Sequence, residues 1–139
     1  MELIANTLQT VEAGANVQFT DEVVSGCNSI LHRAGSGLAT LRGITDQCRA
    51  RFKAFFSGNI AIPAGGTVEA ISLAVSINGE AIASTTMIQT PAAVEEFANI
   101  ASAVYIDVPA GCCVSIAVRN TSAQAIDVQN ANLIIERVA

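Results

Sequence analysis

The sequence predicts an all-β fold, an antiparallel sandwich or barrel, and three observations predict it. Apolar and polar residues alternate over short segments, which is the period of a strand with one buried face. Clusters of Gly, Pro, Asn and Ser separate these segments about every ten residues. No long helical pattern lies between them, so crossover helices for a parallel sheet are missing.

Length and composition favour one domain that associates with itself. The 139 residues are enough for one core but hardly for two. Hydrophobic residues make up 51% of the chain and charged residues 14%, against about 25% charged residues in an average domain. So little ionic surface predicts an oligomer with buried faces.

Charge and hydropathy argue against two kinds of partner. The net charge of -5 comes from 7 basic and 12 acidic residues scattered along the chain. This is not the basic patch that binds phosphate backbones, so we expect no nucleic-acid partner. No window approaches the ~20 apolar residues of a membrane-spanning helix, so we expect no membrane insertion.

Met1 is followed by Glu2 without a basic segment or a long apolar run, so we expect no signal peptide.

The first strands are short, and the next two carry clear signals. The early candidates are Val17–Thr20, Ser29–His32 and Leu38–Arg42. Basic residues then alternate with Ala and Phe over residues 49–54, which predicts a strand with one cationic and one apolar face. Residues 71–77 alternate in the same way and end at Asn78-Gly79, a dipeptide that accepts the positive φ angles of a tight hairpin.

One turn chemistry occurs twice in the remaining chain. Pro-Ala-Gly follows an apolar run at residues 63–65 and again at 109–111, so we expect two similar strand connections. Residues 114–119 then alternate as a strand, Ile126 and Val128 resume the pattern, and Leu133–Ile135 reads as a central strand. Thr90–Ala98 has a cap, a proline and helical spacing, which predicts at most a turn or two of helix.

Four segments taken in order resemble a known superfamily across essentially the whole chain. They are CRARFKAFFSGNIAIPAGG, AISLAVSINGEAI, YIDVPAGCCVSIAVRNTS and NANLIIERVA. The pattern is similar to bacterial and phage members of the tumour-necrosis-factor and complement-globular-head superfamily. The resemblance implies a ten-strand jelly roll, a tight homotrimer and neighbouring chain termini. It also implies that residues 1–14 are a short tether or first strand and residues 15–139 the jelly-roll domain.

The resemblance implies display in place of catalysis. Stalkless heads of this kind look like phage head-fibre or decoration proteins and like the tips of spore-surface filaments. We therefore expect a non-enzymatic structural protein on the virion surface, with capsid or surface-filament proteins as partners. The alternative is a glycan- or receptor-binding adhesion module on a bacterial or spore surface, with a host glycan as ligand.

The four cysteines leave several structural interpretations open. Cys27 and Cys48 are the candidate disulfide pair. Reduced packing cysteines are the main alternative, and a zinc site that adds His32 and Cys112 or Cys113 is a minor one, because the spacing lacks CxxC pairs. Neighbouring residues of a strand point to opposite faces, so one of Cys112 and Cys113 should point to the core.

Two further groups are candidates for contacts with other molecules. Large apolar side chains contribute most in a subunit contact, and the candidates there are Phe52, Phe55, Tyr105 and Cys113. A basic row is a candidate face for an anionic ligand and consists of Arg49, Arg51 and Lys53. Such a row pairs equally well with acidic groups on a neighbouring strand or subunit.

The chain offers little catalytic chemistry. It has one histidine, His32, and its carboxylates are isolated apart from adjacent pairs, which point apart on a strand. We find no phosphate-cradling glycine loop. The expectation is therefore no enzyme activity, no catalytic residues, no metal and no cofactor.

Overall fold

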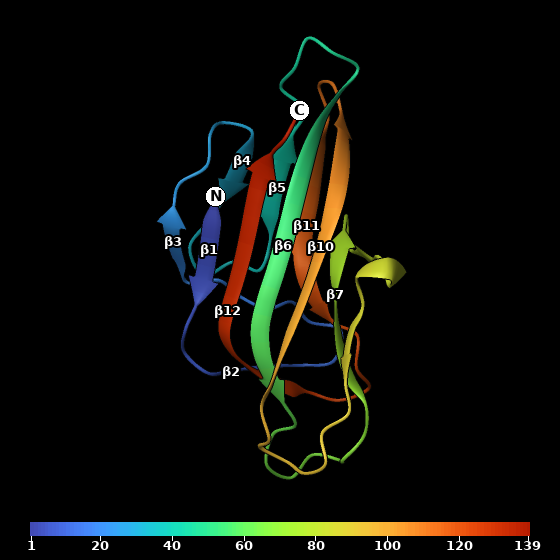
Figure 1. Cartoon of the computed structure of the whole chain (residues 1–139). Helices are drawn as coiled ribbons and strands as arrows, with labels where there is room; N and C mark the ends of the chain where they lie inside the picture. Colours follow the sequence, from blue (N-terminus) through green and yellow to red (C-terminus); the bar gives the residue numbers. More distant parts are fainter.

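The computed structural model describes residues 1–139 as two antiparallel sheets of six strands each, packed face to face (Figure 1). Sheet A has the order β10 (Ala98–Pro109), β6 (Arg49–Ala61), β12 (Ile126–Arg137), β1 (Glu2–Ala5) and β3 (Asp21–Val24), with β2 (Gln9–Val11) also paired to β12. Sheet B has the order β4 (Ile30–His32), β5 (Ala39–Arg42), β11 (Cys113–Asn120), β7 (Ile71–Ile77) and β8 (Glu80–Ala81), with β9 (Met87–Gln89) also paired to β7.

The structure has twelve strands, two more than the ten expected, because two strand paths are interrupted. β1 and β2 both run along β12, and β8 and β9 both run along β7. A short 3-10 helix at Ala83–Thr85 separates β8 from β9. If each interrupted path counts once, ten remain.

The gap between β8 and β9 is closed by a side chain. The N–H of Val75 in β7 donates to the hydroxyl of Thr85 over 2.9 Å, and this hydroxyl donates to the carbonyl of Ile82 over 2.7 Å. Thr85 is buried, so an unpaired Val75 N–H would be costly there. The threonine hydroxyl replaces the partner that a continuous edge strand would supply.

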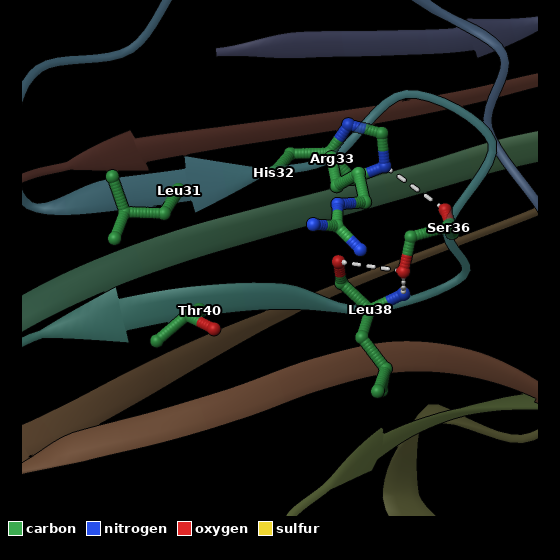
Figure 2. Close-up of a pocket in the computed structure, with 6 residues that line it drawn as sticks. All are labelled: Leu31, His32, Arg33, Ser36, Leu38 and Thr40. Carbon is green, nitrogen blue, oxygen red and sulfur yellow. Dashed lines mark hydrogen bonds between the residues drawn. The ribbon is translucent and has the colours of Figure 1, made fainter.

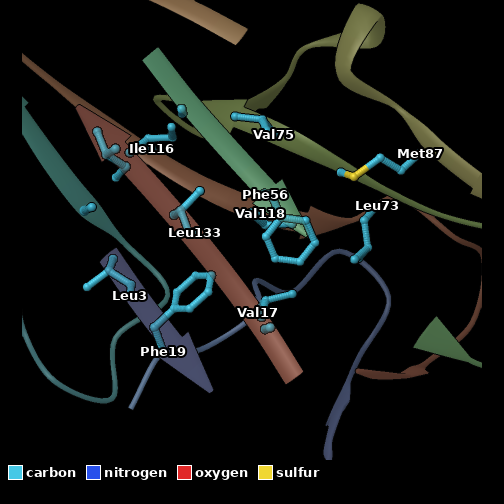
Figure 3. Packing of buried hydrophobic residues seen from close by; sticks show 14 of the residues in the cluster. Leu3, Val17, Phe19, Phe56, Leu73, Val75, Met87, Ile116, Val118 and Leu133 are labelled. Carbon is cyan, nitrogen blue, oxygen red and sulfur yellow. The ribbon is translucent and has the colours of Figure 1, made fainter. Parts of the chain in front are cut away.

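The alternation in β6 explains how the core forms. Every second residue from Ala50 to Phe56 is fully buried, while those between them face outward. The buried side of β6 joins a core cluster of 29 residues drawn from both sheets (Figure 3). Phe19 and Phe56 meet edge to face there, with ring centroids 6.5 Å apart, a geometry that aromatic pairs favour.

The predicted turns are present with the expected backbone geometry. Asn78 and Gly79 both have positive φ, 52° and 84°, and connect β7 to β8, as a tight hairpin requires. The two Pro-Ala-Gly turns match one another. Gly66 N–H donates to Pro63 O over 2.9 Å and Cys112 N–H donates to Pro109 O over 3.0 Å, with a positive-φ glycine between them in each turn.

One local expectation was wrong, and the expectation of at most a turn or two of helix at Thr90–Ala98 holds at its lower limit. Val17–Thr20 forms no strand, although Val17 and Phe19 are buried in the core. Its backbone bonds go to different segments, because Val17 N–H donates to Val118 O whereas Phe19 bonds the backbone of Gly35 and Ser36, so no continuous ladder forms. Residues 90–97 form a loop without a helical turn, in which Glu95 adopts φ 59°. No helix in the structure is long and apolar enough to span a lipid bilayer.

The first 14 residues are part of the sandwich and not a tether in front of it. β1 pairs with β12 and β3, and β2 pairs with β12. The α-ammonium of Met1 donates to Ile135 O over 2.7 Å, so the N-terminus lies against the last strand. The buried side chain of Asn120, at the end of β11, donates to the carbonyls of Val11 and Gln124 and accepts from Ser122 N–H. These bonds tie β2 to sheet B.

Candidate functional site

The outward face of sheet A presents an uncharged band across three strands. Strand register aligns Ala103 of β10, Phe55 of β6 and Ile134 of β12. Phe55 and Ile134 are each 38% exposed. We call these three residues the apolar row. Outward side chains that align between neighbouring strands form one continuous surface, so the row crosses the middle of the face.

Polar groups border the apolar row on both sides. Towards one end, Tyr105 aligns with Lys53 and Glu136, and the tyrosine is 64% exposed. Towards the other end, the amides of Asn99, Asn59 and Asn130 form a chain of hydrogen bonds of 3.2 and 3.3 Å. The sequence reasoning missed this amide chain, since its members come from three strands and form no local motif.

The four candidate interface residues do not form one surface. Phe55 and Tyr105 lie together on the outward face of sheet A. Phe52 is 0% exposed and belongs to the core, because residues 52 and 55 of one strand point to opposite faces. Cys113 begins β11 in sheet B. Phe52 is therefore withdrawn as an interface residue, and Cys113 belongs to a different surface.

Two of the three residues of the basic row share one carboxylate within their own sheet. Arg51 binds Asp107 of β10 with two hydrogen bonds of 2.7 and 3.1 Å, and Arg49 lies 3.2 Å from the same carboxylate. The hydrogen bonds from Arg51 are the main reason that the pKa of Asp107 lies below its ordinary value, and the reverse interaction raises the pKa of Arg51. The structure therefore favours pairing with a neighbouring strand over an anion-binding face. Lys53 has no ion pair.

His32 lies beside a shallow hollow on sheet B, the β4–β5 hollow, lined by Leu31, His32, Arg33, Ser36, Leu38 and Thr40 (Figure 2). Its Nε2 bonds the backbone carbonyl of Ser36 over 2.9 Å, and its ring meets Phe19 edge to face. Nδ1 is buried without a partner. The Ser36 hydroxyl pairs with the backbone of Leu38 instead, so these two residues are not arranged as a nucleophile and its base.

All four cysteines are free, exposed thiols. Cys27 and Cys48 form no disulfide in the structure. Cys112 and Cys113 do not divide between core and surface as expected, because Cys112 lies in the turn before β11 and both are exposed. No three histidine, cysteine or carboxylate side chains gather in a group suited to a metal ion.

The fold class follows from this geometry. The chain is an all-β domain of two antiparallel sheets with almost no helix. No family model and no curated protein matches the sequence.

Solved structures agree on the fold. The Eiger TNF of S. frugiperda superposes with a TM-score of 0.71 at 13% identity, covering 100% of this chain and 92% of that one. The globular domain of zebrafish complement 1qA superposes with a TM-score of 0.63 at 8% identity, covering 96% and 93%. At such identities the likeness concerns the fold alone.

Proposed function

We propose that the chain is a non-enzymatic structural protein that works as a homotrimeric head displayed on a particle surface. The observation that carries the proposal is the apolar row on the outward face of sheet A. Exposed apolar residues scattered singly need no explanation, but a contiguous row beside Tyr105 indicates a contact. The low charge content of the chain points the same way.

A closed trimer needs two different patches that fit one another. The outward face of sheet A is the first. The second is the β9–β10 edge, which carries exposed Ile88, Val94 and Phe97 and is formed by the end strand of sheet A together with β9. A stable contact buries about 800 Å² on each partner, more than the apolar row alone provides. The neighbouring uncharged positions Ala101, Ser57 and Ile4 extend it.

The trimer is tested by the native mass of the protein in solution. Light scattering should give three times the 14.3 kDa of one chain. Ile134→Glu places a charge in the proposed contact and should lower the mass to that of a monomer, since an unpaired buried charge is costly. Leu31→Glu is the control, because Leu31 is also an exposed aliphatic residue on a strand, at 46% against 38% for Ile134, but lies on sheet B. A monomeric wild-type protein would refute the trimer.

The finer part of the proposal places the head on a virion, as a capsid decoration or head fibre. The order of its strand and turn motifs, which resembles such proteins, supports this location. Genes on either side of the coding sequence provide the test. Capsid genes beside it would support the virion, whereas spore-coat or surface-filament genes would favour a bacterial surface.

A second candidate is a glycan-binding module, and the β4–β5 hollow favours it. The hollow combines the guanidinium of Arg33 and the hydroxyl of Thr40 with the exposed side chains of Leu31 and Leu38. Donors beside apolar contacts suit the hydroxyl groups and the carbon faces of a sugar. A glycan array should then give hits that Arg33→Ser weakens, and an array without hits would count against this function.

A further inference from the structure

The four cysteines, which are far apart in the sequence, lie at one end of the sandwich. Ala110 N–H donates to Cys48 O over 3.0 Å, and Gly43 N–H donates to Cys112 O over 2.9 Å. The loop of residues 43–48 therefore sits directly against the turn between β10 and β11. Figure 1 shows this loop, this turn and the C-terminus at the same end of the molecule.

The other two cysteines are connected to the same end through β5. Cys113 pairs with Arg42 across β11 and β5. Arg42 N–H in turn donates to Ser29 O over 2.7 Å, and Ser29 lies two residues after Cys27. We call the surface formed by the four cysteines the thiol end.

The thiol end has two properties of a contact surface. All four thiols are exposed and none is bonded. Ile44 and Val138 expose apolar side chains at the same end, where the Ile44 carbonyl accepts a 2.7 Å hydrogen bond from Arg137. Exposed thiols combined with exposed apolar groups are unfavourable on a surface that stays in water.

The surroundings of Cys27 favour its thiolate. The backbone N–H of Ser29, followed by its hydroxyl, holds the pKa of the Cys27 thiol below its ordinary value, and the charge of Arg137 lowers this pKa further. Arg137 also donates to the Ser29 hydroxyl over 3.2 Å, which fixes the group beside Cys27. A thiol in such surroundings is present more often as the thiolate, the form that attacks a disulfide.

We propose that the thiol end is a site of disulfide cross-linking to a second copy of this chain, which joins two heads end to end. Two identical copies related by a two-fold axis bring the same patch opposite itself. Each thiol end then faces another thiol end, and Ile44 and Val138 are covered by their counterparts. The trimer contact uses a face and an edge of the sandwich, so it leaves this end free. The inference therefore goes beyond the proposed function and does not depend on it.

The chemistry is thiol–disulfide exchange with a small-molecule disulfide such as glutathione disulfide. The Cys27 thiolate attacks one sulfur, breaks the S–S bond and releases one glutathione thiolate, which leaves a mixed disulfide on the protein. A cysteine thiolate of the second copy then attacks the Cys27 sulfur and releases the second glutathione thiolate. Two protein thiols are oxidised and one disulfide is reduced to two thiols. The two protons from the protein thiols pass to solvent or to the released thiolates.

The experiment incubates the purified full chain with glutathione disulfide at mildly alkaline pH. Non-reducing gels should show a covalent dimer that dithiothreitol reverses, and the native mass from light scattering should double. Cys27→Ser should slow dimer formation, because it removes the thiol whose surroundings favour the thiolate, the form that attacks a disulfide.

The control is a protein whose four cysteines are replaced by serine and which carries Val68→Cys. Val68 is exposed in the loop between β6 and β7, at the opposite end of the sandwich (Figure 1). This control protein should form covalent dimers more slowly than the wild type, and an equal rate would overturn the proposal. Glutathione adducts or intramolecular disulfides without a covalent dimer would also overturn the proposal. Covalent dimers that leave the native mass unchanged would overturn it as well. The native mass of the reduced protein tests the trimer separately.

Discussion

Two phenylalanines of β6 provide a direct test of which face is core and which is contact. Phe52 is 0% exposed and Phe55 is 38% exposed, on opposite sides of the same strand. Replacing each by alanine removes the same atoms from two different environments. Phe52→Ala should weaken the subunit itself, whereas Phe55→Ala should weaken the assembly.

The magnitudes follow from burial. A buried Phe→Ala change costs about 3–5 kcal/mol, and with a urea dependence of about 2 kcal/mol per molar the midpoint of Phe52→Ala should fall by about 2 M. For Phe55, 38% of the residue is exposed, or about 75 Å² of an aromatic side chain of roughly 200 Å². At about 25 cal/mol per Å², covering this area contributes about 2 kcal/mol to each contact. Its loss should raise the dissociation constant about 30-fold.

The assays are urea unfolding followed by circular dichroism, and light scattering over a dilution series. Both variants must be compared with the wild type at one protein concentration, because association itself shifts the unfolding midpoint. Phe55→Ala should dissociate at concentrations where the wild type stays assembled. An unchanged dilution curve for Phe55→Ala would refute the use of this face as a contact. Equal losses of subunit stability in the two variants would refute the assignment of the two faces.

Three further predictions concern the subunit. Asn120→Ala should lower the free energy of unfolding by about 3 kcal/mol, since it leaves buried backbone groups unpaired, and urea unfolding measures this. The lowered pKa of Asp107 means that its pairing stabilises the fold above the ordinary carboxyl pKa of about 4 and that this contribution is lost as the pH falls through the folded value. The difference in urea midpoint between wild type and Asp107→Asn should therefore vanish in acid. Gly43→Ala would place a Cβ against Pro109 O and should lower the melting temperature, measured by calorimetry.

Strand alternation and turn chemistry made much of the fold predictable. The pattern in residues 71–77 and the dipeptide Asn78-Gly79 specify a strand and a hairpin through local preferences alone. The repeated Pro-Ala-Gly needs only the positive φ of its glycine. Each of these segments has the predicted conformation in the structure.

A segment whose side chains are buried but which forms no strand was not predictable in the same way. Val17 and Phe19 alternate as a strand does and are buried as strand residues are, yet their backbone bonds go to two different segments and form no continuous ladder. Periodicity reports which side chains are buried, whereas strand pairing depends on where the rest of the chain lies. The strand at Glu2–Ala5 was left open between a tether and a first strand over residues 1–14, because its pairing depends on β12 at the far end of the sequence.

Which residues of an alternating strand face the core also has to be judged from the whole strand. Phe52 and Phe55 are both large and aromatic, and the sequence reasoning grouped them as one interface. Their separation of three residues places them on opposite faces, and the basic residues at 49, 51 and 53 already mark the outward phase that Phe55 shares. The signal that separates core from contact was therefore present in the sequence.

The ion pairs on sheet A bear on whether its outward face can be covered. Burying an unpaired charge opposes association, and Arg49 and Arg51 lie on the same face as the apolar row. Because Asp107 binds both guanidinium groups within the subunit, one of their two positive charges is compensated before a partner packs on Phe55 and Ile134. The cross-strand pairing that argues against an anionic ligand thus also lowers the cost of covering this face with another subunit.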